Sequence, residues 1–284
     1  MKLVNQSVKL IPQEAGLEGM YKQIEEAART CYKSEDKIME GSAKRIVYNL
    51  INNKHTAMLE HGTVYLTIPN NRSVSEYRPY SYINEDKDNW YITTNYRVIK
   101  ENHLESDLEY LTDPTEFYEK RITVKCITSI GIGRELCRHR KFSFAQESTR
   151  YCNYSKDKFD NNITFITPNW VTLNNGPYEY DSGEFIGDGY IDDISSNTKE
   201  ANLLWVLSEI EDAYKEYSKL GLKAQDIRDI LPLCTKSEIV ITGFEEDWKH
   251  FFDLRLKETT GKVHPDMKIL AQMIYENIYG AQSN

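Results

Sequence analysis

The chain has few cysteines, and none of them form a recognisable metal or redox pair. Five cysteines are scattered over 284 residues, with no C-x-x-C pair and an odd total. Structural zinc sites and disulfide frameworks both depend on organised cysteine spacings. The sequence therefore indicates reduced, mostly buried thiols and supports neither kind of site.

Long apolar runs are also absent. No segment approaches the roughly 18 apolar residues of a membrane-spanning helix, and residues 1–6 do not begin the apolar core of a signal peptide. These two absences favour a cytoplasmic protein that needs no membrane partner.

Several common catalytic motifs are missing as well. The chain has no Walker loop, no G-x-S-x-G elbow and no H-E-x-x-H pair. Gly131 and Gly133 match half of a dinucleotide-binding fingerprint, but Leu136 occupies the third glycine position. Because His55 and His61 have no third ligand at zinc-binding spacing, we expect no metal.

The composition is that of a large globular protein with an acidic balance. Hydrophobic residues make up 40% of the chain and the formal net charge is -9, so a single domain over residues 1–284 can bury a sizeable core. An acidic chain does not present the broad basic face of a general nucleic-acid binder. We therefore expect no nucleic-acid partner, whereas a local basic pocket for a small anion remains compatible with the charge.

Helical and strand periodicities alternate along the chain, which indicates an α+β fold. Helical spacing predicts helices near residues 19–32, 46–53, 134–138, 203–217, 245–258 and 265–279. Alternation predicts strands near residues 3–10, 63–68, 121–128 and 237–242. Two segments, about 70–119 and 170–199, are predicted to be insertions with little regular structure, apart from a strand-like run at 90–94.

The cations of this acidic chain are concentrated between residues 134 and 150. Five arginines and lysines stand against two carboxylates there, and the segment reads Arg138-His139-Arg140, then seven residues, then Ser148. A basic helix end exposed to solvent would explain the cations alone. The neutral donors that follow favour a binding segment for a dense anion, and helical spacing places Arg134 and Arg138 on one face.

Arg255 is the second unusual cation. Helical spacing places it on one face with Trp248, Phe251 and Phe252. An arginine on an aromatic, inward-facing stripe is costly unless an anion or a carboxylate meets it.

The Arg-His-Arg-x7-Ser pattern resembles the signature of flavin-dependent thymidylate synthases. Four further segments resemble that family in the same order along the chain: Ala28-Arg29-Thr30-Cys31, His55 to His61, Arg228 to Pro232 and Phe251 to Arg255. The resemblance implies the fold of that family, with a mixed or antiparallel sheet flanked by helices, here carrying insertions. It also implies a homotetramer whose sites are shared between subunits.

The resemblance further implies a reaction, the reductive methylation of dUMP to dTMP. FAD would be the cofactor, 5,10-methylenetetrahydrofolate the carbon donor and NADPH the reductant. Ordinary thymidylate synthases activate the uracil ring with a cysteine in a Pro-Cys-His setting, and no Pro-Cys pair occurs here. By resemblance, Arg255 would be the catalytic residue, polarising the uracil and favouring ionisation at N3.

Carried over position by position, the family's binding residues fall into two sets. The dUMP set is Glu135, Arg138, Gln146, Glu147, Ser148, Thr149, Arg150, Arg228 and Arg255. The FAD set is Ala57, Glu60, Arg138, His139, Arg140, Lys141, Ser143, Gln146 and His250.

Some positions depart from the family pattern. Phe244 and Glu246 stand where the family has polar Asn and Arg contacts to the flavin, and His250 replaces a third Asn. The order Gln146-Glu147 leaves open which of the two takes the usual carboxylate role.

Two other classes of function remain. A nucleotide- or RNA-binding module without catalysis would use the same arginines for phosphates and the tyrosines for stacking, and would bind polynucleotides with a steep salt dependence. A flavin enzyme that methylates uracil in tRNA would need an FAD-type fingerprint, against which Leu136 stands.

Overall fold

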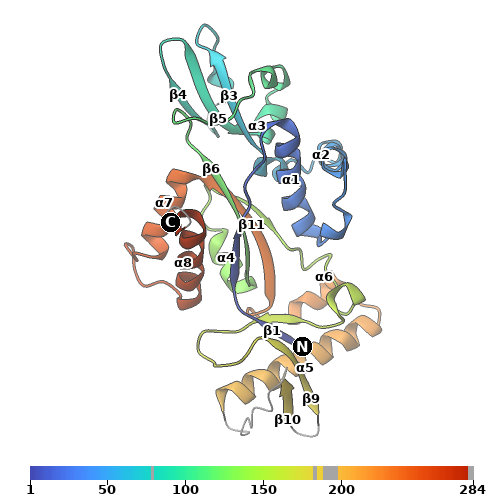
Figure 1. The fold of residues 1–284 in the computed structure, drawn as a ribbon. Coiled ribbons are helices and arrows are strands. Elements are labelled where there is room, and N and C mark those ends of the chain that lie inside the picture. The colour runs from blue at the N-terminus through green and yellow to red at the C-terminus, as the bar shows by residue number, and fades with distance from the viewer. Residues whose placement is uncertain (78–79, 182–183, 188–197, 281–284) are drawn as a thin grey trace.

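The structure is a computed structural model, which describes residues 1–77, 80–181, 184–187 and 198–280. It is an elongated α+β molecule in which three small sheets follow one another along the long axis (Figure 1). Two sheets are antiparallel, the third is mixed, and helices flank them. The predicted fold class is therefore confirmed.

The central sheet has the strand order β2-β6-β11-β7, and all its neighbouring strands are antiparallel. β6 and β11 pair over their full length, beginning with Arg121 opposite Phe244. The strands are β2 (Ser7–Leu10), β6 (Arg121–Ser129), β7 (Ser143–Gln146) and β11 (Lys236–Phe244). Val124, Cys126 and Ile239 are fully buried, as expected for long strands covered by helices.

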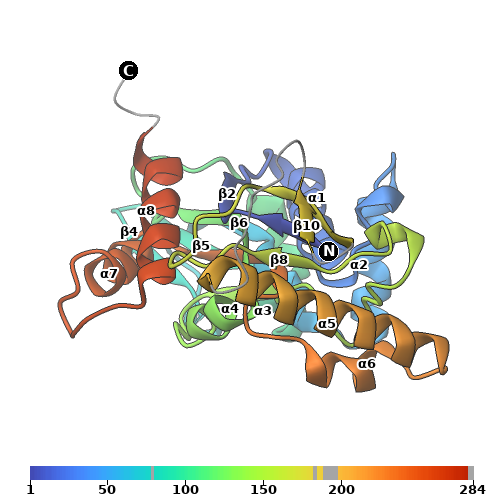
Figure 2. The ribbon, with the colours of Figure 1, turned by 90° about the horizontal axis from the view of Figure 1, so that it is seen from below.

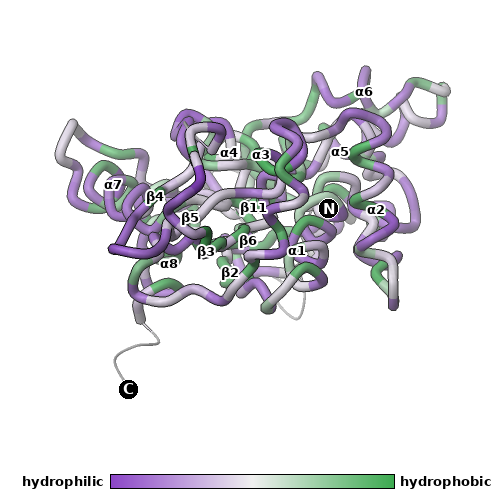
Figure 3. Tube along the Cα trace, turned by 90° about the horizontal axis from the view of Figure 1, so that it is seen from above, coloured by the Kyte–Doolittle hydropathy of each residue, from purple (hydrophilic) through white to green (hydrophobic). Residues whose placement is uncertain are grey.

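Helices cover both faces of this sheet. α1 packs against β7 and β11 with α2 behind it, whereas α7 and α8 lie on the opposite side (Figure 1). Their bounds are α1 (Gly16–Tyr32), α2 (Ser42–Asn52), α7 (Glu245–Arg255) and α8 (Pro265–Tyr279). Hydrophobic segments gather at the centre of the molecule, around β2, β3 and β6 (Figure 3). No helix in the described ranges combines the length and apolarity that a membrane crossing requires.

The first predicted insertion is a folded unit. Its strands are antiparallel in the order β3-β5-β4, and a short helix follows them. We call these elements the inserted sheet: β3 (Thr63–Pro69), β4 (Tyr82–Glu85), β5 (Asn89–Asn95) and α3 (Tyr96–Glu101). Asp86 closes the β4–β5 turn, since its Oδ1 accepts from the backbone N–H groups of Asp88 and Asn89.

The prediction of little regular structure for residues 70–119 is therefore wrong. β3, which was predicted outside the insertion, pairs with β5 along its whole length. Leu66 and Ile92 of this sheet share one core with Ile24 of α1, so long-range packing stabilises strands whose local pattern is weak.

The third sheet, order β10-β9-β1-β8, lies at the other end of the molecule, and α5 runs across it (Figure 2). Its elements are β1 (Lys2–Val4), β8 (Thr164–Ile166), β9 (Gly176–Asp181), β10 (Glu184–Gly187), α5 (Lys199–Lys219) and α6 (Ala224–Ile227). The predicted strand over 3–10 is thus two strands in different sheets. The β9–β10 hairpin also corrects the prediction of little regular structure for 170–199, of which 182–183 and 188–197 lie outside the described residues.

Candidate functional site

Arg255, at the end of α7, makes two polar contacts with the segment around the Arg-His-Arg motif. Its Nε donates to Nε2 of His139 at 2.9 Å, and its Nη1 donates to Oε2 of Glu135 at 3.3 Å. Trp248 and Phe251 of the same helix are buried. The prediction that this arginine meets an anion or a carboxylate is confirmed, because Glu135 supplies the carboxylate.

The contact with Arg255 also determines the protonation of His139. A guanidinium can only donate, so Nε2 accepts and the proton of the neutral ring is on Nδ1. Burial, followed by the positive charges of Arg255 and His250, lowers the pKa of His139 to about 4. The imidazole is therefore neutral at pH 7, held edge-on against Phe251 with ring centroids 4.9 Å apart.

α4 (Ile130–Leu136) positions Glu135 but ends before Arg138. Ser129 caps the helix, since its Oγ accepts from the backbone N–H of Ile132 at 3.1 Å. After Leu136 the chain turns back into β7, so the prediction that Arg134 and Arg138 share a helical face is wrong. Both side chains are exposed.

A cavity of about 690 Å³ lies where the inserted sheet meets the central sheet. α3, β4 and β5 line one side, while β7, the end of β11 and the start of α7 line the other. Four residues of the predicted FAD set lie together on its walls: Glu60, Arg140, Lys141 and Ser143. Phe244 and Glu246, which depart from the family pattern, line the same cavity.

The charges on the cavity walls are only partly paired. Lys141 lies 3.0 Å from Oδ1 of Asp247. Arg97 of α3 lies 2.6 Å from Oε1 of Glu60, and its Nε also binds a carboxylate, that of Glu101. Two further guanidiniums, those of Arg121 and Arg140, have no carboxylate within 4.0 Å among the described residues.

These groups fit an anionic ligand that also carries aromatic rings. Arg121 lies 5.6 Å from the centre of the Phe244 ring, and its Nε is buried without a hydrogen-bond partner in the described part of the chain. Unpaired guanidiniums bind phosphate, and exposed aromatic edges pack against nucleotide rings. The donor set is thus compatible with a flavin nucleotide whose phosphates lie beside Arg121 and Arg140, since the Glu119 and Glu246 carboxylates of the same lining would repel them.

The end of β7 sends Gln146 and Glu147 in opposite directions, as alternation along a strand requires. Gln146 lies against α4, and its Nε2 donates to Oγ of Ser237 at 3.0 Å. A Cβ on Gly133 of α4 would lie 2.7 Å from that amide nitrogen, so the absence of a side chain there permits the close approach.

Glu147 is held in the interior. Its side chain is 0% exposed, and Oε2 lies 2.9 Å from Nζ of Lys236. It also accepts from the Tyr154 hydroxyl at 3.1 Å and from the backbone N–H of Glu238 at 3.2 Å. In this chain Gln146, rather than Glu147, therefore lies on the side of Glu135.

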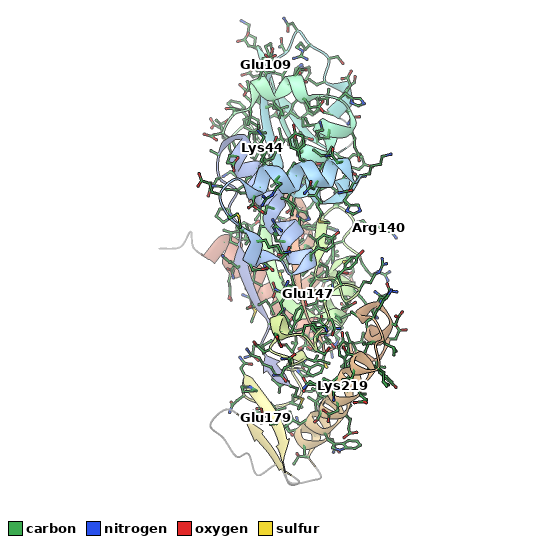
Figure 4. All side chains as sticks on the ribbon, turned by 90° about the vertical axis from the view of Figure 1, so that its right-hand side faces the viewer. Lys44, Glu109, Arg140, Glu147, Glu179 and Lys219 are labelled. Atoms are coloured by element: carbon green, nitrogen blue, oxygen red, sulfur yellow. The ribbon has the colours of Figure 1, made fainter. Side chains whose placement is uncertain are left out.

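Three other residues of the predicted dUMP set, Ser148, Arg150 and Arg228, lie on other elements than Arg255. The backbone N–H of Ser148 donates to the carbonyl of Cys31 at 3.0 Å, and the exposed Arg150 lies over the ring of Tyr151. Arg228 is exposed in the 3-10 helix η6 (Arg228–Ile230). No contact recorded in the described ranges joins these three residues to Arg255. Within the motif segment itself, Arg140 and Glu147 lie at different heights along the long axis of the molecule (Figure 4).

Five residues of the predicted FAD set lie outside this cavity lining: Ala57, Arg138, His139, Gln146 and His250. Ala57 is in the 3-10 helix η2 (Thr56–His61), next to Glu60, and His250 is exposed on α7 near His139. His61 is fully buried, 2.9 Å from the hydroxyl of Thr242, and burial lowers its pKa to about 3. No group of three metal-ligating side chains occurs in the residues that the structure describes.

Sequence reasoning missed two cations of the cavity. Arg97 lies in a segment predicted to be irregular, and Arg121 is the first residue of a strand, where an arginine ordinarily faces solvent. No spacing or motif pointed to either residue. Only the packing of the inserted sheet against the rest of the chain brings Arg97 and Arg121 to the cavity.

The comparisons with known proteins agree with the sequence pattern. The family described as "Thymidylate synthase complementing protein" matches residues 93–281, about two thirds of the chain, and the chain belongs to this family. Its predicted membership of the flavin-dependent thymidylate synthases is thereby confirmed. The matched region begins after the segments at 28–31 and 55–61.

Curated relatives bear the name flavin-dependent thymidylate synthase. The protein of Pyrococcus abyssi is 32% identical over 124 residues, 44% of this chain and 41% of that protein. The protein of Synechocystis is 24% identical over 160 residues, 54% of this chain and 65% of the relative. The chain thus spans about two fifths to two thirds of the length of these relatives.

Among solved structures, the UMP/dUMP methylase PolB of Streptomyces cacaoi is similar at 15% identity and a TM-score of 0.46. The match covers 99% of this chain and 92% of that chain.

Proposed function

We propose that this protein is a flavin-dependent thymidylate synthase that methylates dUMP to dTMP. The carbon would come from 5,10-methylenetetrahydrofolate and the electrons from NADPH through FAD. The family membership and the Arg255 cluster support this proposal, since a guanidinium held beside a neutral imidazole is suited to a polar, ionisable ring.

Glu60, Arg140, Lys141 and Ser143 would hold the FAD in the 690 Å³ cavity. Arg140, which has no carboxylate partner in the described chain, is suited to a phosphate group. The bound flavin would supply the hydride that reduces the transferred one-carbon group. Ala57 of η2, His139 between α4 and β7, and His250 of α7 would complete this site.

Arg255 would act on the pyrimidine. Its guanidinium is held by His139 and Glu135, so little conformational entropy is lost when uracil binds. A fixed positive charge stabilises the negative charge that develops on the uracil as N3 loses its proton, which raises the electron density at C5. The side chains of Ser148, Arg150 and Arg228 would bind the phosphate of dUMP. Other subunits of a homotetramer would contribute these side chains.

The observation that carries the proposal is the Arg255–His139–Glu135 cluster within the Arg-His-Arg region. The test is an assay of dTMP formation from dUMP, methylenetetrahydrofolate and NADPH, with a visible spectrum of the purified protein. We expect a yellow, oligomeric protein that forms dTMP. A colourless monomer that binds no added FAD, or binds polynucleotides instead, would count against it.

A further inference from the structure

Arg121 is a half-buried cation that neither the motif nor the family pattern accounts for. Burial lowers its pKa to about 10, despite the nearby negative charges of Glu60 and Asp247. It has no carboxylate within 4.0 Å in the described part of the chain. A half-buried charge without a charged partner costs free energy, so an anionic ligand that pairs with Arg121 would offset that cost.

The hydrogen bonds of Arg121 satisfy one end of its guanidinium and leave the rest open. Nη1 donates to the carbonyl oxygen of Glu60 at 3.0 Å and to Oγ1 of Thr63 at 3.4 Å. Nε is buried and has no partner among the described residues. The guanidinium is thus held in place through Nη1, whereas Nη2, which is not among the buried unpaired atoms, has no hydrogen bond recorded in the described part of the chain and is the donor open to a ligand.

Arg121 lines the ligand cavity and also borders a second cavity of about 350 Å³. Arg121 pairs with Phe244 across β6 and β11, and both residues line the 690 Å³ cavity together with Arg140. The inserted sheet begins with β3 shortly after Glu60, and the chain enters β6 of the central sheet at Arg121, so Arg121 lies where the two sheets meet.

We infer that Arg121 is an additional phosphate-binding residue of this cavity and acts with Arg140 on the diphosphate of the bound dinucleotide. The inference rests on the proposed function for the identity of that ligand. It gives the inserted sheet a role, because Glu60 and Thr63 at the base of that sheet orient the guanidinium.

The test measures binding of three probes to the full-length protein, using flavin fluorescence and calorimetry. FAD carries the diphosphate, riboflavin carries the ring system without phosphate, and inorganic diphosphate carries the charge alone. Arg121→Gln should raise the Kd for FAD and for inorganic diphosphate by about tenfold or more, the effect of losing a charged hydrogen bond. The Kd for riboflavin should stay within about twofold of the original value.

Arg45→Gln is the matched control, since Arg45 is exposed on α2 and does not line this cavity. It should leave all three affinities unchanged. If Arg121→Gln does not fold, Arg121→Lys keeps the charge but loses the planar fork, and should still weaken FAD more than riboflavin.

Every other outcome contradicts the inference, the proposed function or both. Unchanged FAD affinity in Arg121→Gln, or an equal loss for FAD and riboflavin, overturns the inference while leaving the proposed function intact. If the wild-type protein binds diphosphate through Arg121 but binds no flavin, the anion site stands and the proposed function fails. If it binds neither, both fail.

Discussion

At the residue scale, the protonation of His139 and the orientation of Arg255 depend on each other. Arg255 requires an acceptor at Nε2, and its charge helps to keep the ring from gaining a second proton. The Glu135 carboxylate contacts another nitrogen of the same guanidinium, Nη1, at 3.3 Å. This arrangement makes Arg255 a fixed cation rather than a mobile one.

Replacing Arg255 tests that role directly. We expect Arg255→Ala to retain FAD and to lower kcat for dTMP formation roughly 100-fold, the cost of removing one fixed donor from a transition state. Flavin content by absorbance and product by chromatography measure the two effects. Lys257→Ala is the control, because Lys257 is 71% exposed and pairs with Asp253. Full activity in Arg255→Ala would refute the assignment of this residue.

The imidazole of His139 provides a second test. Its folded pKa of about 4 lies below the ordinary 6.5, so as the pH falls through this window the unfolded chain binds the proton first and stability declines. NMR of the imidazole should show no titration of His139 between pH 6 and 8. In Arg255→Ala the pKa should rise, since one positive charge is removed, but burial should keep it below 6.5. A wild-type titration near 6.5 would contradict the contact.

At the element scale, a buried ion network joins the end of β7 to β11, β6 and α1. Lys236 bridges Glu147 and Oε1 of Glu238, Lys33 shares that Oε1, and Lys125 pairs with Oε2 of Glu238. Burial alone would raise the pKa of Glu238, but Lys236 and Lys33 hold it at about 2. The network therefore anchors the backbone that leads into Ser148.

Removing one cation should show how strongly that network holds the strand end. Lys236→Met leaves the fully buried Glu147 without a positive partner, so we expect a loss of about 3–5 kcal/mol in the free energy of unfolding. Urea denaturation measures it. Lys219→Met, at a 75% exposed lysine paired with Glu216, should cost less than about 1 kcal/mol. Equal effects of the two substitutions would show that the buried contact contributes no more to the free energy of unfolding than the exposed one.

At the scale of the whole molecule, one chain brings Glu135 to Arg255 but leaves Arg228 apart from them. A homotetramer with shared sites would unite them. Co-expression of Arg228→Ala with Arg255→Ala, each inactive alone, should then restore up to about a quarter of the activity, because random mixing gives that share of intact sites.

The control for complementation uses two residues in contact within one chain. Glu135→Ala with Arg255→Ala should restore nothing, since every site would lack one of them. Recovery in both mixtures, or in neither, would contradict sites shared in this way. Light scattering of the purified protein gives the oligomeric state independently.

Much of the architecture was predictable because it depends on local periodicity. The helices α1, α7 and α8 and the long strands β6 and β11 follow from apolar spacing that one face must bury. The inserted sheet could not be predicted in this way. Its strands are stabilised by a core shared with α1, and its short segments carry little pattern of their own.

The sequence by itself determined which segments carry the concentrated cations of the candidate site. Its cations are concentrated at 134–150, and an aromatic helix face ends in Arg255, both of which are legible from neighbouring residues. Only the tertiary structure decided that Glu147 is buried against Lys236 and that Arg121 reaches the cavity. Those contacts join residues far apart in the chain, and strand pairing and packing, rather than local spacing, bring them together.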